Sequence, residues 1–209
     1  MVAVKVRAEG SRRTQRERRE STRAALLSAA AAVIVETGPS TGVAEIAGRA
    51  GVSTGALQYH FGSKTELLVA VVEVGWNDLI ERTREITADA PPAERIASLV
   101  SSMWTSYQQP TCRAAFLVSS DPNVSAEVAD RSAAVFDAAR SRLDQLWSDV
   151  FVDLQLPIER VSAARRFARS HLMGMIVQRQ MGSVEPDPRE ELDLLGQATL
   201  RILTDRSAS

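Results

Sequence analysis

The sequence is poor in the residues that support most catalytic and metal-binding chemistry. Its 209 residues include one cysteine and two histidines. A single cysteine, Cys112, excludes a disulfide within the chain, so we expect a reducing, cytoplasmic compartment. His60 and His171 lie far apart, and no common metalloprotease, redox-dithiol, serine-hydrolase or phosphate-loop motif occurs. We therefore predict a protein that is not an enzyme and that uses no metal or cofactor.

Long apolar runs are also absent, and no segment approaches the ~18 residues that a membrane-spanning helix needs. The segment AALLSAAAAVIV at 24–35 follows a basic stretch, as the apolar part of a signal peptide does. It is mostly alanine, however, and ETGPS follows it in place of a cleavage site. We interpret it as a buried helix and expect no membrane partner.

Aromatic residues make up only 5% of the chain, so alanine, leucine and valine must supply most of the core. Apolar residues recur at helical spacing along most of the chain, and no segment alternates as a strand does. Proline and glycine separate these segments. We predict an all-α fold with helices at 16–37, from the N-cap Thr41 to Ala50, 54–61, from the cap Ser63 to before Pro91, 93–108, 111–119, 125–154, 158–181 and 189–204.

The net charge of −1 is unevenly distributed. Residues 1–23 hold eight Lys or Arg and three Glu, a net charge of +5, which leaves −6 for the remainder. Such an asymmetry is typical of an end that faces nucleic acid, and equally of a solvated tail. We predict a basic, disordered arm at residues 1–15, and one hypothesis is that it reaches a DNA minor groove.

The segment AGVSTGALQYHFGSK at 50–64 predicts a helix-turn-helix. Gly51 allows a tight turn between two short helices, and Ser53 caps the second of them. Leu57 and Phe61 are four residues apart and are expected to face the core. The rest of this short helix is small, polar and free of acidic residues, which suits entry into a DNA major groove.

Individual side chains of this helix can be given expected roles. Gln58 can bond an adenine edge, and the methyl groups of Thr54 and Ala56 can meet a thymine methyl. Tyr59 and His60 can donate to phosphate oxygens. The predicted DNA-binding residues are Thr41, Ser53, Thr54, Gly55, Ala56, Gln58, Tyr59, His60 and Lys64.

Lys64 stands at the first position of the next helix, where the helix dipole disfavours a cation. Departures from such local rules tend to fall at functional sites. A DNA phosphate held between this helix terminus and the Lys64 ammonium would account for the residue. The alternative is a solvated surface lysine.

Residues 41–68, TGVAEIAGRAGVSTGALQYHFGSKTELL, resemble the DNA-binding signature of the TetR family of bacterial transcriptional regulators. The detailed resemblance covers roughly residues 21–68. The family usually has tyrosine where this chain has Gln58, so Gln58 is expected to contact either a base or a phosphate. The matching positions are Thr41, Ile46, Ala47, Ala50, Gly51, Val52, Ser53, Gly55, Leu57, His60, Phe61, Ser63 and Lys64.

The resemblance implies a homodimer built on the last two helices, at 158–181 and 189–204. Each of these helices carries an apolar stripe, and small residues such as Ala168 permit close approach of a partner helix. The alternative is that these are internal core helices. His171 lies near the first stripe and is expected to be an interface or core residue. The predicted interface residues are Val161, Ala164, Ala168, Leu172, Met175, Ile176, Leu192, Leu195, Thr199 and Ile202.

The resemblance also implies a small-molecule pocket within the body of the protein. Its candidate residues are Met103, Trp104, Tyr107, Gln108, Arg113, Phe116, Phe136, Trp147 and Met173.

We thus expect a DNA-binding domain at 16–62 and a helical effector-binding and dimerisation domain at 63–205. The expected function is a ligand-responsive regulator, a repressor that a small apolar or amphipathic effector releases from a palindromic operator in double-stranded DNA. The alternative is a helical protein-interaction module without specific DNA binding.

Overall fold

The structure, a computed structural model, describes residues 14–180, 182 and 188–205. Within these residues every regular element is helical, which confirms the predicted all-α class. The predicted basic arm lies outside the described residues except for its last two, Thr14 and Gln15. The elements are α1 (Gln15–Thr37), α2 (Val43–Arg49), α3 (Thr54–Phe61), α4 (Lys64–Arg84), α5 (Pro92–Gln108), α6 (Pro110–Ser120), α7 (Ala126–Val150), the 3₁₀ turn η1 (Val152–Leu154), α8 (Ile158–Gln180) and α9 (Arg189–Thr204).

Most helix ends follow the predicted signals, and three differ. The helix predicted from Ser63 to before Pro91 already ends at Arg84. The predicted N-cap of α2, Thr41, is wrong, because Gly42 holds the cap position without any side-chain hydrogen bond. Thr41 instead donates its hydroxyl to the Glu45 carboxylate at 2.8 Å. The helix predicted at 125–154 ends at Val150, where Phe151 leaves helical geometry and η1 begins.

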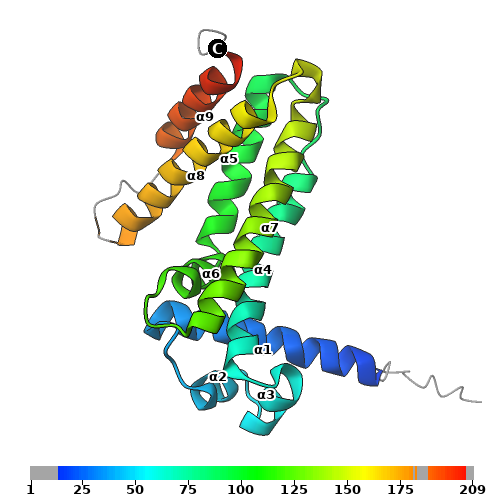
Figure 1. Ribbon diagram of the computed structural model, residues 1–209, viewed down its shortest axis with the longest axis vertical. Coiled ribbons are helices and arrows are strands. Elements are labelled where there is room, and N and C mark those ends of the chain that lie inside the picture. The colour runs from blue at the N-terminus through cyan, green and yellow to red at the C-terminus, as the bar shows by residue number, and fades with distance from the viewer. Residues whose placement is uncertain (1–13, 181, 183–187, 206–209) are drawn as a thin grey trace, which may run out of the picture.

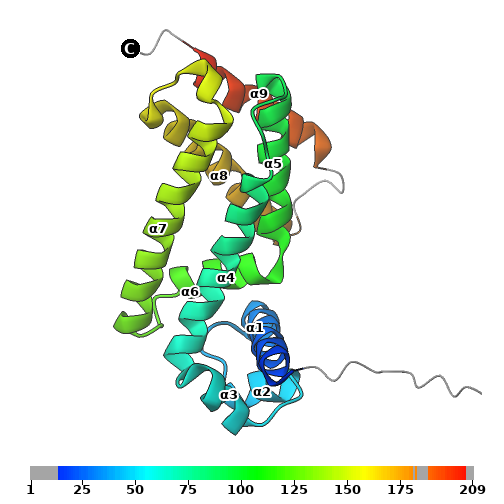
Figure 2. The same cartoon turned by 90° about the vertical axis from the view of Figure 1, so that its right-hand side faces the viewer.

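The molecule is elongated, with α4 and α7 running along its long axis (Figure 1). Helices α2 and α3 form one end, and α1 crosses beside them and projects to one side. Helices α8 and α9 lie at the opposite end, next to α5 (Figure 2). Helix α4 therefore connects the helix-turn-helix directly to the body.

The core consists of two clusters of buried apolar residues. One contains the inner faces of α1, α2, α3 and the first half of α4, closed by residues of α6 and α7. The other lies between the second half of α4 and helices α5, α7, α8 and α9. Trp76 of α4 packs against both clusters. The packing is therefore continuous across the predicted domain boundary at residues 62 and 63.

Helices α4 and α6 cross closely at Gly75. A Cβ atom at this position would lie 2.7 Å from the Thr111 carbonyl oxygen and 2.7 Å from the Ala115 Cβ. Both distances are shorter than van der Waals contact, so glycine is required for this crossing. The crossing lies between the two clusters. Gly75 immediately precedes Trp76 in the sequence.

Candidate nucleic-acid interface and effector cavity

The turn between α2 and α3 is formed by glycine and by backbone hydrogen bonds. Gly51 has φ of 69°, a conformation that favours glycine and that fits the sequence prediction. The Val52 amide donates to the Ala47 carbonyl at 3.0 Å, which closes the turn. The Ser53 hydroxyl accepts from the Ala56 amide at 3.2 Å and begins α3.

Helix α3 buries one face and exposes the other. Leu57 and Phe61 are buried in the amino-terminal cluster, as the sequence predicted. Ser53, Thr54, Gly55, Gln58 and Tyr59 are exposed, whereas Ala56 and His60 are half-buried. The exposed members of the predicted DNA-binding set thus form a short polar face, which is open to solvent and hence to a DNA groove.

Thr41, also among the predicted DNA-binding residues, is only 7% exposed. Its hydroxyl is occupied by Glu45 of the α2 first turn. In this position Thr41 orients the start of α2.

The Gln58 side chain is engaged within its own helix. Its amide nitrogen donates to the carbonyl oxygen of Gly62, the residue that ends α3. The last carbonyls of a helix lack partners within it, so this contact stabilises the carboxyl end of α3. This bond uses one of the two N–H donors of the Gln58 amide, so the second N–H and the amide oxygen are left for a base or a phosphate.

Two arginines of α1, which the sequence analysis did not assign to the site, lie against α3. The Arg19 guanidinium lies 5.5 Å from the Tyr59 ring centroid, and that of Arg23 lies 4.9 Å from the Phe61 ring centroid. Their i, i+4 spacing places both on one face of α1. The spacing could have shown that they share a face, but not which helix that face meets.

These arginines also change the chemistry of His60. Burial, followed by the charges of Arg19 and Arg23, lowers the pKa of His60 below its ordinary value. Its Nδ1 atom is buried without a hydrogen-bond partner. The imidazole is therefore neutral at pH 7 in the folded protein, and the positive charge beside α3 comes from α1.

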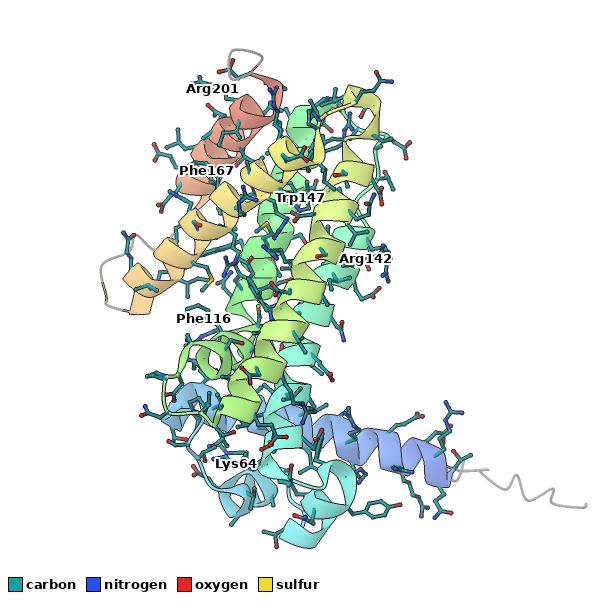
Figure 3. All side chains as sticks on the ribbon, viewed as in Figure 1. Lys64, Phe116, Arg142, Trp147, Phe167 and Arg201 are labelled. Carbon is teal, nitrogen blue, oxygen red and sulfur yellow. The ribbon has the colours of Figure 1, made fainter. Side chains whose placement is uncertain are left out.

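Lys64 begins α4 and is half-buried, near the junction of the helix-turn-helix and the body (Figure 3). Burial lowers the pKa of its ammonium group. The predicted cap Ser63 is confirmed, because its hydroxyl accepts from the Glu66 amide at 3.1 Å. The Glu66 carboxylate itself pairs with Arg131 of α7 at 2.6 Å, which ties the first turn of α4 to the body.

An apolar cavity lies in the body between α4, α5, α6 and α8. Four of the predicted pocket residues, Tyr107, Arg113, Phe116 and Met173, line it. Its free volume is about 60 Å³, and Phe116 is partly exposed at its edge. The other lining residues are Trp76, Cys112, Leu117, Arg169, Ile176 and Val177.

The remaining predicted pocket residues lie in three different environments. Trp104 and Gln108 line a neighbouring cavity that shares Tyr107 and Arg113 with the first. Phe136 packs edge-on against Trp76, with ring centroids 5.2 Å apart. Met103 and Trp147 are buried in the carboxy-terminal cluster and line neither of these two cavities.

The stripes predicted at a dimer interface face the chain's own core. Five residues of the α8 stripe are at most 1% exposed, namely Val161, Ala164, Ala168, Leu172 and Met175. Leu195 and Thr199 of α9 are also buried, and Ile176, Leu192 and Ile202 are half-buried against the same cluster. His171 lies on the exposed side, where its Nε2 atom is 3.3 Å from the Glu191 carboxylate.

Other apolar residues of α8 and α9 remain open to solvent. These are Ile158, Phe167 and Val177 on α8 and Leu194 on α9. Phe167 lies on the side of α8 near α9 (Figure 3).

The described part of the chain contains neither a membrane-spanning helix nor a metal-binding cluster. None of its helices is both long and apolar enough to cross a membrane. It also contains no group of three or more His, Cys, Asp or Glu residues placed to hold a metal ion. Burial raises the pKa of the Cys112 thiol to about 12, so the thiol stays protonated at neutral pH.

Comparison with known proteins identifies the amino-terminal part of the chain. The model of the family "Bacterial regulatory proteins, tetR family" matches residues 26–71. The HTH-type transcriptional regulator CymR of Pseudomonas putida is 40% identical over 86 residues, which are 41% of this chain and 42% of that protein. The HTH-type transcriptional activator FasR of Mycolicibacterium smegmatis is 43% identical over 79 residues, which are 37% of this chain and 36% of that protein.

The matched region thus spans less than half the length of these curated relatives. A solved structure extends the similarity to the whole fold. A TetR family transcription regulator from Marinobacter aquaeolei VT8 superposes with a TM-score of 0.70 at 19% identity, over 90% of this chain and 98% of that one. The matching family and both curated relatives are transcriptional regulators. Residues 26–71 thus match the DNA-binding region of the TetR family of bacterial transcriptional regulators in sequence, and the chain shares the fold of a solved TetR family regulator.

Proposed function

We propose that this regulator is a homodimeric repressor, which binds an inverted-repeat operator in the cytoplasm and leaves it when a small apolar or amphipathic effector enters the body. The observation that carries the proposal is the exposed face of α3 beside the arginines of α1, joined through α4 to a body that contains an apolar cavity.

The chemistry of the exposed face supports DNA binding. No acidic residue occurs between Ala50 and Lys64, so the face does not repel phosphates. The side chains are short, apart from Gln58 and Tyr59, and α3 can enter a major groove. Arg19 supplies a cation next to Tyr59, where a DNA backbone would pass.

The exposed apolar residues of α8 and α9 support a dimer. Since the predicted stripes pack within the chain, we assign the partner contact to Phe167, Val177 and Leu194 instead. A two-fold axis there would bring two copies of the same surface together. The two α3 helices would then address half-sites about one DNA turn, roughly 34–36 Å, apart.

The position of the cavity supports effector-induced release. Trp76 lines the cavity and belongs to α4, whose first turn directly follows the helix-turn-helix. A ligand that separates α4 from α6 would move both α3 helices relative to each other. Because the operator fixes their spacing, such a movement lowers DNA affinity.

The test is a selection of random DNA duplexes by the purified protein at about physiological salt, followed by sequencing. We expect an enriched inverted repeat, with affinity that falls steeply as salt rises. The control is the Arg19→Ala, Tyr59→Ala double variant, which should remain folded and enrich nothing. An absence of enrichment by the effector-free wild-type protein would contradict the proposal and favour a protein-interaction module.

A further inference from the structure

We propose that the effector is an organic acid with a compact apolar body, whose carboxylate binds between Arg113 and Arg169. This inference rests on the proposed function, since it specifies the ligand of the same cavity. It is based on the positive charges that line the cavity and on the absence of a counter-charge for them.

Apart from its basic groups, the wall of the cavity is almost entirely apolar. Its apolar lining residues include Trp76, Phe116, Met173 and Ile176. Its charged lining residues are Arg113 on α6 and Arg169 on α8. No described residue that lines the cavity is an aspartate or a glutamate.

Neither arginine is neutralised elsewhere in the described part of the chain. The ion pairs found there involve other arginines or His171, and Arg165, one turn before Arg169, pairs with Asp144 at 2.6 Å. Arg169 instead lies over the Phe136 ring, 5.1 Å from its centroid. Both arginines are half-buried, and a partly desolvated charge without a counter-charge is unfavourable. An anionic ligand would supply that counter-charge.

A second cavity next to the first shows the same pattern. It shares Tyr107, Arg113 and Ile176 with the first, and adds Arg179, which lies over the Trp104 ring at 5.4 Å. Its described lining residues also include no carboxylate. The two cavities meet at Arg113 and Tyr107, so these residues are accessible from both sides.

The shape of the site favours a carboxylate over a larger or more highly charged anion. A carboxylate accepts paired hydrogen bonds from the planar guanidinium group. Burial raises the pKa of the Tyr107 phenol, so its hydroxyl stays protonated and able to donate. The free volume of about 60 Å³ would hold about two water molecules. An apolar body must therefore displace side chains, and the partly exposed Phe116 is the one best placed to move.

The inference can be tested with acids and neutral molecules of the same shape. Octanoate and 3-phenylpropionate would be compared with octanamide and 3-phenylpropanamide by titration calorimetry on the full chain without DNA, up to millimolar ligand. We expect at least one acid to bind about tenfold or more tightly than its amide, as hydrogen bonds to a charged group imply. Equal binding of acid and amide, preference for the amides, or no binding of either acid would overturn the inference.

Substitutions of the two cavity arginines test whether they bind the carboxylate. Arg113→Gln and Arg169→Gln should each reduce acid binding about tenfold and leave amide binding unchanged. Arg169→Lys should restore part of the binding. Arg166→Gln is the matched control, because Arg166 is exposed on α8 and lines neither cavity. Thermal melts would verify that each variant is folded, and unchanged acid binding by both cavity variants would contradict the assignment.

The measurement separates this inference from the proposed function. If the protein binds an operator but no acid, the proposed function stands and only the inference of a carboxylate ligand is overturned. Acid binding by a protein that selects no operator would contradict the proposed function instead. An acid that binds but leaves operator affinity unchanged would show that the cavity is not the effector site.

Discussion

Tyr59 is 70% exposed on α3, and Arg19 lies over its ring. Its hydroxyl is therefore free to donate to a phosphate that Arg19 also attracts. We predict that Tyr59→Ala lowers operator affinity about tenfold or more, the usual effect of losing a hydrogen bond to a charged group. Fluorescence anisotropy with a labelled operator would measure the loss, and thermal unfolding should be unchanged because the ring is not buried.

Gln58 offers a contrasting prediction on the same helix. Because its amide donates to the Gly62 carbonyl, Gln58→Ala should destabilise the end of α3 by up to about 1 kcal/mol. Operator affinity should fall less than it does for Tyr59→Ala. Chemical denaturation would measure the change in stability. A larger loss of affinity than that of Tyr59→Ala, without loss of stability, would instead assign Gln58 to direct contact with DNA.

His60 makes stability depend on pH. Its pKa is lowered in the folded state, so the unfolded chain, with the ordinary value of 6.5, binds the proton more readily. The stability that the folded protein gains by keeping His60 neutral is therefore fully present above pH 6.5, and it is lost as the pH falls below that value. We predict that the free energy of unfolding decreases from pH 7 to pH 5 more steeply for the wild type than for His60→Asn. Parallel slopes in urea denaturation would contradict this prediction.

At this scale the sequence predicted which residues gather on α3 and which of them face the core. Leu57 and Phe61 could be placed because one helical period determines both. Arg19 and Arg23 could not, since their position against α3 depends on how α1 crosses it. The hydrogen bond from Gln58 to its own helix was missed, because the sequence analysis considered this side chain only for a DNA contact and not for a competing local bond.

Among the helices, the close crossing of α4 and α6 gives a sharp expectation. Gly75→Ala would place a Cβ atom 2.7 Å from a backbone oxygen, which cannot rotate away. We predict a loss of stability of about 1–3 kcal/mol, as for other overpacked interiors. Gly48→Ala in α2 is the matched control. It meets nothing within 4 Å and should stabilise the protein by about 0.5–1 kcal/mol through helix propensity alone. Thermal melts that rank the two variants in the opposite order would refute this view of the crossing.

Helix positions were well predicted, since proline, glycine and capping residues separate the helices. The direction of the α8 stripe was harder to assign. An apolar stripe has the same period whether it packs on its own chain or on a partner. Here α5, α7 and α9 cover it, and only the packed structure could show this.

For the whole molecule, the exposed apolar side of α8 and α9 predicts the oligomeric state. We expect that Phe167→Asp with Leu194→Asp weakens the dimer about a hundredfold or more, because each charged side chain replaces buried apolar area in both copies. Analytical ultracentrifugation would measure the dissociation. Val152→Asp is the control, since Val152 is 65% exposed and belongs to η1 and not to α8 or α9. A doubly substituted protein that remains as dimeric as the control would place the interface elsewhere.

Trp76 has a further consequence, which concerns how the molecule can be observed. It lines the cavity, packs against both clusters and follows the glycine at the α4 and α6 crossing. Of the three tryptophans, Trp147 is fully buried, and Trp104 lies at the neighbouring cavity beside Arg179. Emission from Trp76 therefore depends on the state of the cavity and of the junction together. Trp76 is thus an intrinsic fluorescent probe at the junction between the cavity and the helix-turn-helix. The difference in emission between the wild type and Trp76→Phe would follow ligand entry and helix displacement in real time, without any attached dye.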